Sequence, residues 1–215
     1  VLRRLSLIAD TLSHVALAGV AIALLTKTFA PVVALIATTS AAVSIEELRM
    51  RRLLPGDAAL AVFLYGSLAV AVVLISIADG FNSTLFSYLF GSVLTVTQTD
   101  LWWMAALAIV ISVFMLMFSS ELAQITFDPD IARINGVRVH LLNLGLAVLT
   151  GATITVSMRV VGVLLVGALI VIPVLVSLRI TQGMTRTVIA SSIVGVFVAV
   201  VGMVIAYHAD IAPGG

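Results

Sequence analysis

The sequence predicts an all-α polytopic membrane protein with seven membrane spans. Hydrophobic residues make up 62% of its 215 positions and charged residues only 10%, against about 25% charged in ordinary soluble domains. Mean hydropathy is +1.27, and apolar stretches of about 20 residues, the length that crosses a bilayer, recur along the chain. Together these observations exclude a soluble domain with one anchor. The predicted spans are 6–26, 31–48, 58–78, 100–119, 139–157, 160–178 and 187–207.

The basic residues of the connections predict the orientation. Nine arginines fall on one side of the predicted spans, and only Lys27 and Arg159 fall on the other. Because basic loops are retained in the cytoplasm, residue 1 is expected on the cytoplasmic side and residue 215 outside. The nine are Arg3, Arg4, Arg49, Arg51, Arg52, Arg133, Arg138, Arg179 and Arg186.

The first span carries an acid and an imidazole, Asp10 and His14, in otherwise apolar or small surroundings. A spacing of four residues places both side chains on one helix face. At about 1.5 Å per residue from Arg4, His14 lies ~15 Å deep. Ionisable groups at such depth mark ion pathways or proton relays, and this pair also supplies ligands for a divalent transition metal. The alternative is a structural role, in which a hydrogen bond between the carboxylate and the imidazole holds neighbouring helices together.

The external connection 80–98 is apolar but rich in Ser and Thr, and it is too short to span. It is predicted as a re-entrant or interfacial helix buried against protein. An amphipathic surface helix is an equally good interpretation.

The cytoplasmic connection 128–137 is predicted to hold a short helix with well-specified ends. Asp128 is suited to the N-cap, Pro129 to the first helical position and Asp130 to the positive helix end, whereas Gly136 ends the helix in the left-handed conformation. Such a helix can dock into a groove on a cytoplasmic partner, although well-capped passive loops also exist.

The sixth span contains Pro173, which frees a backbone carbonyl and is a possible hinge. Gly162 and Gly167 in the same region, with Gly145 and Gly151 in the preceding span, permit close approach of helix backbones. Ordinary helix packing is the preferred interpretation of the glycines.

Several chemistries are excluded by what the sequence lacks. There is no cysteine, so disulfides, thiolate metal sites and nucleophilic thiols are absent. No Walker A motif occurs, and the only lysine is Lys27 on the outer side, so ATP hydrolysis would need a partner. The net charge of +1 gives no indication of nucleic-acid binding. The chain opens at a helix entry without Met and stops at Pro213-Gly214-Gly215, and is expected to be a fragment.

The motifs resemble those of the permease subunits of metal-ion (zinc, manganese or iron) ABC importers. The resemblance is carried by 3–19 with its Asp-x-x-x-His, by Leu89-Phe90-Gly91-Ser92 with Asp100-Leu101-Trp102, by 127–179, and by 210–214. It covers nearly the whole chain in the right order. It implies a type II importer permease with nine spans, of which this chain would hold seven in a single transmembrane domain, 1–215.

The resemblance also implies a function and partners. A homodimer of permeases in the bacterial cytoplasmic (inner) membrane would sit on a cytoplasmic ABC ATPase dimer, with an extracytoplasmic solute-binding protein delivering the metal. Asp10 and His14 would line the path, and the segment 128–137 would be the coupling helix. The protein would be no enzyme and would hold no tightly bound cofactor, only its transported metal. The residues implied in ATPase coupling are Asp128, Pro129, Asp130, Ala132, Arg133 and Gly136.

Zn²⁺ is the expected cargo, because the string Asp-Thr-Leu-Ser-His-Val-Ala-Leu-Ala-Gly at 10–19 is similar to zinc-type members. Mn²⁺ or Fe²⁺ import is the alternative within the family. A second alternative is a secondary transporter that relays protons through Asp10 and His14. That function would give the 129–135 helix no role. An intramembrane metal hydrolase would want more ligands and a general base.

Overall fold

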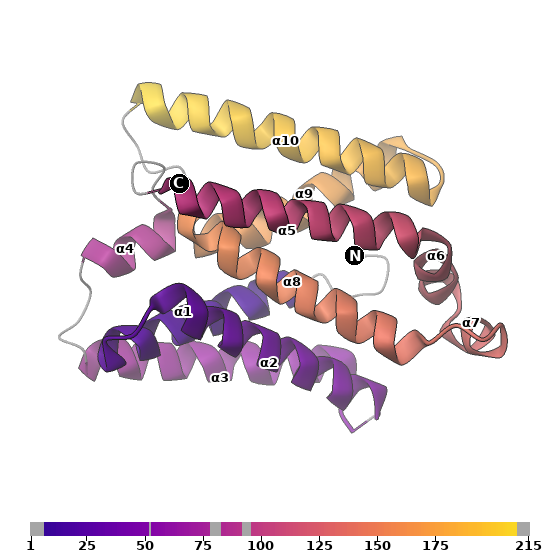
Figure 1. The fold of residues 1–215 in the computed structure, drawn as a ribbon, viewed down its shortest axis with the longest axis horizontal. Coiled ribbons are helices and arrows are strands. Elements are labelled where there is room, and N and C mark those ends of the chain that lie inside the picture. Colours follow the sequence, from indigo (N-terminus) through magenta and orange to yellow (C-terminus); the bar gives the residue numbers. More distant parts are fainter. Residues whose placement is uncertain (1–6, 52, 78–82, 92–95, 210–215) are drawn as a thin grey trace.

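The computed structural model describes residues 7–51, 53–77, 83–91 and 96–209, and these residues form ten helices (Figure 1). Predictions that concern Arg3, Arg4, Arg52, 210–214 and parts of 80–98 therefore lie outside the described residues. The helices are α1 (Ile8–Thr26), α2 (Ala30–Met50), α3 (Gly56–Ile77), α4 (Ser83–Phe90), α5 (Gln98–Met117), α6 (Ser119–Phe127), α7 (Pro129–Ile134), α8 (Val139–Val161), α9 (Val163–Ile180) and α10 (Met184–Ala209).

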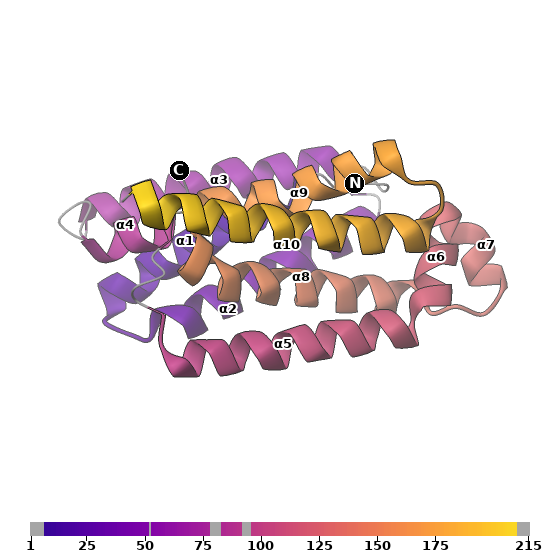
Figure 2. The same cartoon turned by 90° about the horizontal axis from the view of Figure 1, so that it is seen from above.

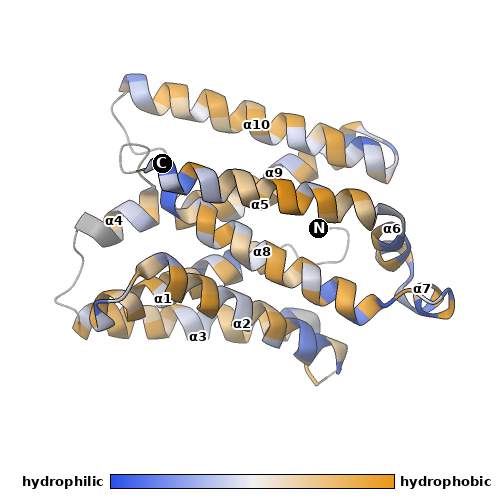
Figure 3. Ribbon diagram, viewed as in Figure 1, coloured by the Kyte–Doolittle hydropathy of each residue, from blue (hydrophilic) through white to orange (hydrophobic). Residues whose placement is uncertain are grey.

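The all-α prediction is confirmed, and six helices among the described residues are long and apolar enough to cross a membrane. They are α1, α2, α3, α5, α8 and α10, and each matches a predicted span to within a few residues. The remaining predicted span, 160–178, corresponds to α9, whose apolar stretch Leu165–Ile180 is shorter. The long helices run roughly side by side in both views (Figures 1 and 2), and apolar residues cover them along most of their length (Figure 3).

Short elements lie at the two ends of this bundle. At one end, α6 and α7 pack together and α7 contacts the start of α8 (Figure 1). We call this the α7 end, and it is the predicted cytoplasmic side. At the opposite end, α4 contacts α8 and α9. We call this the α4 end. The segments of α7 and α4 are predicted as connections on opposite sides of the membrane. Their positions at opposite ends of the bundle agree with that prediction.

The inner helix of the bundle is α1, which packs against α2, α3, α8 and α9. Small residues allow this packing: a Cβ added to Gly19 of α1 would lie 2.7 Å from Ala34 Cα of α2. The next contact, between α2 and α8, is equally close, since a Cβ on Gly151 would lie 3.2 Å from the Thr38 carbonyl carbon. The Gly151 contact agrees with the packing role predicted for that glycine, whereas the Gly19 contact was not predicted.

The break between α8 and α9 lies at Gly162, not around Arg159 as the predicted spans implied. Gly162 has φ +85°, and a Cβ there would lie 2.5 Å from Gly91 N, at the end of α4. Only a glycine fits this backbone crossing without strain. Arg159 is instead part of the last turn of α8.

The sequence analysis assigned no helix to residues 119–127, where the structure has α6. Phe118, with φ −109° and ψ 18°, separates α6 from α5. The Leu122 and Ile125 side chains of α6 are buried together with Ala132 and Val139. This small apolar cluster packs α7 against α6 and α8. The sequence analysis did not predict it.

Candidate functional site

Asp10 and His14 lie on one face of α1, as their spacing predicted. His14 Nε2 is 3.6 Å from Asp10 Oδ1. Hydrogen bonds of this kind are mostly shorter than about 3.2 Å, so the two groups face each other without a good hydrogen bond. Both residues come from the same helix, so their contact does not lock neighbouring helices together. The pair presents an imidazole nitrogen and a carboxylate oxygen side by side on one helix face.

The two side chains differ in exposure. The His14 side chain is 20% exposed and that of Asp10 is 53% exposed. Among the described residues, the buried His14 Nδ1 has no hydrogen-bond partner. The ring therefore has an unpartnered nitrogen on its buried side, while its other nitrogen faces Asp10.

The neighbouring helix α9 leaves space beside Asp10. Gly167 stands opposite it, and a Cβ there would lie 3.8 Å from both Asp10 Cα and Oδ1, in ordinary contact distance. A larger side chain at position 167 would extend toward the carboxylate. The glycine predicted to serve packing therefore also borders the Asp10–His14 pair.

One copy of the described chain supplies no more than this pair in one place. No group of three or more His, Cys, Asp or Glu side chains suitable for a metal occurs among the described residues. A tetrahedral metal needs four ligands, so a site built on this pair would need two more, from water, from backbone oxygens or from another chain.

The α7 segment has the ends that the sequence predicted. The Asp128 carboxylate accepts hydrogen bonds from the N–H groups of Asp130 (2.9 Å) and Ile131 (3.1 Å). Gly136, at φ +81°, donates its N–H to the Arg133 carbonyl, and the Val137 N–H is bonded to the Ala132 carbonyl. This is the Schellman arrangement. Asp130 and Arg133 also form an ion pair at 2.9 Å.

The residues of α7 divide into buried and exposed groups. Ala132, one of the residues implied in coupling, is completely buried against α6 and α8, so it supports the helix from beneath. The sequence analysis did not single out the large apolar side chains that protrude here: Phe127 is 82% exposed and Ile134 85% exposed, with Ile131 between them. Their spacing of four and three residues, in a connection predicted to hold a short helix, was the available signal.

Pro173 lies inside α9, which continues past it to Ile180. Its ring faces α10, where a Cβ on Gly195 would lie 3.7 Å from Pro173 Cγ. Pro173 is thus part of the contact between α9 and α10, six residues beyond Gly167. Its role as a hinge stays a prediction.

The bundle of long apolar helices describes a multi-pass membrane protein. The model of the ABC 3 transport family matches residues 1–215, and the chain belongs to this family. It is a metal-ion ABC importer permease, a transport component and not an enzyme, in the inner membrane. The resemblance inferred from the sequence motifs is confirmed.

Relatives with known names carry different metals. The "Probable metal transport system membrane protein" of Treponema pallidum (strain Nichols) is 34% identical over 100% of this chain and 80% of its own length. The manganese transport system membrane protein MntC of Listeria monocytogenes is 28% identical, over 100% of this chain and 76% of MntC. The high-affinity zinc uptake system membrane protein ZnuB of Haemophilus influenzae is 26% identical, over 99% of this chain and 81% of ZnuB.

The fold has a counterpart among solved structures. PsaBC from Streptococcus pneumoniae in complex with Fab superimposes with a TM-score of 0.83 at 27% identity, over 99% of this chain and 76% of that chain. The helix arrangement is therefore shared with that solved structure.

Proposed function

We propose that this permease imports Zn²⁺ and that Asp10 and His14 coordinate the ion on its way through the membrane. The observation that carries the proposal is the 3.6 Å separation of His14 Nε2 and Asp10 Oδ1 on one face of the inner helix α1. Two ligands of a tetrahedral zinc at 2.0–2.1 Å are roughly 3.3–3.4 Å apart. A small rotation of either side chain brings the pair to that spacing.

Zinc is proposed as the cargo because the string Asp-Thr-Leu-Ser-His-Val-Ala-Leu-Ala-Gly at 10–19 is similar to zinc-type members. Manganese import is the alternative, since relatives of both kinds match this chain with similar identity.

The pair on one chain supports a site completed by a second copy. Two permeases related by a symmetry axis would contribute two carboxylates and two imidazoles, the four ligands that tetrahedral zinc takes. In this arrangement α9 is a seventh span, and the full permease has nine. A solute-binding protein would deliver the ion at the α4 end, and a cytoplasmic ATPase pair would drive alternating access from the α7 end.

The proposal is tested by uptake of radiolabelled zinc, with manganese as competitor, by the permease co-expressed with its ATPase and binding protein. Asp10→Ala and His14→Ala are expected to reduce ATP-dependent uptake by at least the roughly 10- to 100-fold that loss of an outer-shell partner costs a metal site. His208→Ala is the control, because its exposed ring is bonded at Nδ1 to the Val204 carbonyl oxygen. Undiminished uptake in both variants, with complexes still assembled, would refute the site; effective competition by manganese would reassign the cargo.

The docking role of α7 is tested separately. Ile134→Glu replaces a side chain that is 85% exposed, so folding should be unaffected while an apolar contact with the ATPase is lost. Removal of such an anchor costs about 2 kcal/mol or more in protein interfaces. Ser120→Glu, an exposed position on α6, adds the same charge without removing an apolar group. Co-purification of the ATPase should fall for Ile134→Glu alone; equal recovery with both variants would show that α7 is not the docking element.

A further inference from the structure

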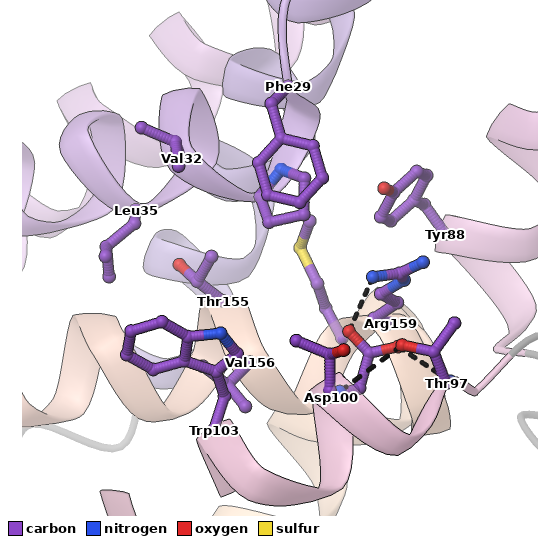
Figure 4. A pocket seen from close by; sticks show the side chains of 13 residues that line it. Phe29, Val32, Leu35, Tyr88, Thr97, Asp100, Trp103, Thr155, Val156 and Arg159 are labelled. Atoms are coloured by element: carbon purple, nitrogen blue, oxygen red, sulfur yellow. Dashed lines mark hydrogen bonds and ion pairs between the residues drawn. The ribbon is translucent and has the colours of Figure 1, made fainter.

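A cavity of about 440 Å³ opens between α2, α4, α5 and α8 at the α4 end of the bundle (Figure 4). Its volume is within the range of small-molecule pockets. Most of its surface is apolar, with the hydroxyl of Thr155 turned to a hydrogen bond with Thr38 at 2.7 Å. The apolar walls are formed by Phe29, Val32, Leu35, Trp103, Val156 and Met158.

The position of the cavity places it at the edge of the hydrocarbon layer. The helix α2 begins at Ala30, α5 begins at Gln98 and α8 ends at Val161, so the lining residues lie in the first or last two turns of three spans. Phe29 and Trp103 on its rim are each 67% exposed. Aromatic side chains are enriched at the membrane interface, and none of the lining residues lies on α1, which carries the Asp10–His14 pair.

One rim of the cavity is charged. The Arg159 Nη1 group donates to Asp100 Oδ1 at 2.5 Å, while Asp100 Oδ2 accepts from the Thr97 N–H at 2.8 Å and from its hydroxyl at 2.7 Å. Both carboxylate oxygens are thus engaged. A guanidinium has five N–H donors, and the contact with Asp100 is the one hydrogen bond recorded for Arg159 among the described residues. The rim therefore has donors to spare and no free acidic oxygen.

We propose that this cavity binds a phospholipid of the outer leaflet, with one acyl chain among the apolar walls and its phosphate on Arg159. The planar guanidinium keeps N–H donors that Asp100 does not use, and such donors match phosphate oxygens. The lipid would also fill the space beside α5, none of whose residues, all described by the structure, is buried. It would thereby add apolar contacts between α5 and α2 to the direct contact of α5 with α8, which includes the Arg159–Asp100 pair.

The test is photolabelling of the full chain, in its transporter complex and in nanodiscs of inner-membrane lipid, by phosphatidylglycerol with a diazirine in one acyl chain. Mass spectrometry should place the label on the α2 and α8 residues of the cavity. Val156→Trp, which fills the cavity, should reduce this labelling by about tenfold, the effect of a lost contact of 1.4 kcal/mol. Val32→Trp, at a more exposed position, provides a second filling variant should the first fail to fold. Val113→Trp on the exposed face of α5 is the matched control.

The role of the phosphate is tested with Arg159→Gln and with a diazirine diacylglycerol that lacks the headgroup. Arg159→Gln should reduce labelling by the phospholipid several-fold and leave the weaker labelling by the diacylglycerol unchanged. Labelling spread evenly over α5 and α10, insensitive to the filling variants, would show annular lipid only and overturn the proposal. The proposal would also be overturned if Phe29→Cys, in this cysteine-free sequence, crosslinked two copies efficiently and the lipid label did not bind. The cavity would then be an interface between two permeases.

Discussion

The helices α1 and α10 are both apolar spans, yet the structure uses them in opposite ways. Twelve of the nineteen residues of α1 are buried, whereas among the twenty-six described residues of α10 only Thr187 and Ala206 are. The more apolar helix is α10. In a soluble protein the more apolar helix would be expected inside; here it lies on the outside of the bundle (Figure 1).

The difference shows what selects the inner helix of a membrane protein. Lipid is as apolar as a leucine side chain, so hydropathy does not distinguish inside from outside, and close van der Waals packing does. Eight of the twelve buried residues of α1 are Ala, Gly, Ser or Thr. These small groups let α2, α3, α8 and α9 approach α1 closely, and they leave room for a carboxylate and an imidazole on its surface.

The largest expected effect comes from crowding the α1–α2 contact. Gly19→Val adds a Cβ that would lie 2.7 Å from Ala34 Cα, and overpacking of this kind costs about 1–3 kcal/mol or more. In Gly202→Val on α10, no atom of the described residues lies within 4 Å of the added Cβ. Thermal unfolding in detergent should show a lower midpoint, or loss of monodisperse protein, for Gly19→Val only. Similar behaviour of the two variants would remove the distinction between inner and outer helix.

A smaller effect is expected at the polar contact between α2 and α8. The Thr38 and Thr155 hydroxyls are 2.7 Å apart and buried. Thr38→Val should destabilise the fold by about 0.6 kcal/mol and at most about 1.7, the values found for hydrogen bonds between membrane helices. The neighbouring Thr39 donates to the Leu35 carbonyl of its own helix at 2.6 Å, so Thr39→Val serves as control. If chemical unfolding showed that Thr39→Val lowers the free energy of unfolding more than Thr38→Val does, the Thr38–Thr155 hydrogen bond would not contribute to stability.

The smallest effect is expected on α10. Ser192 is exposed, and its hydroxyl donates to the Val188 carbonyl of the same helix at 2.9 Å. Ser192→Val should change stability within about 0.5 kcal/mol, as surface substitutions usually do, in the permease purified without its partners. A clear loss of stability in the assembled transporter alone would reveal that another chain covers α10.

Much of the fold was predictable from the sequence because each span is defined by a mostly apolar run, and because Asp128, Pro129 and Gly136 act within their own helix ends. Long-range contacts were not predictable. The Arg159–Asp100 pair joins residues 59 positions apart, and the backbone crossing at Gly91 and Gly162 depends on how α4 folds back.

The candidate site was only partly predictable for the same reason. The four-residue spacing of Asp10 and His14 was enough to place them on one face of α1. It did not indicate that Gly167 of α9 would stand opposite Asp10, or that α1 would be the inner helix, since all the spans are apolar.

The central claim, that Asp10 and His14 hold the transported metal, is tested most directly by X-ray absorption at the zinc edge on the zinc-loaded, nucleotide-trapped transporter. The account predicts a first shell of imidazole nitrogen and carboxylate oxygen at about 2.0–2.2 Å, in which the imidazole scattering disappears in His14→Ala and persists in His208→Ala. A spectrum unchanged by His14→Ala, at equal zinc content, would contradict it and place the metal on other groups.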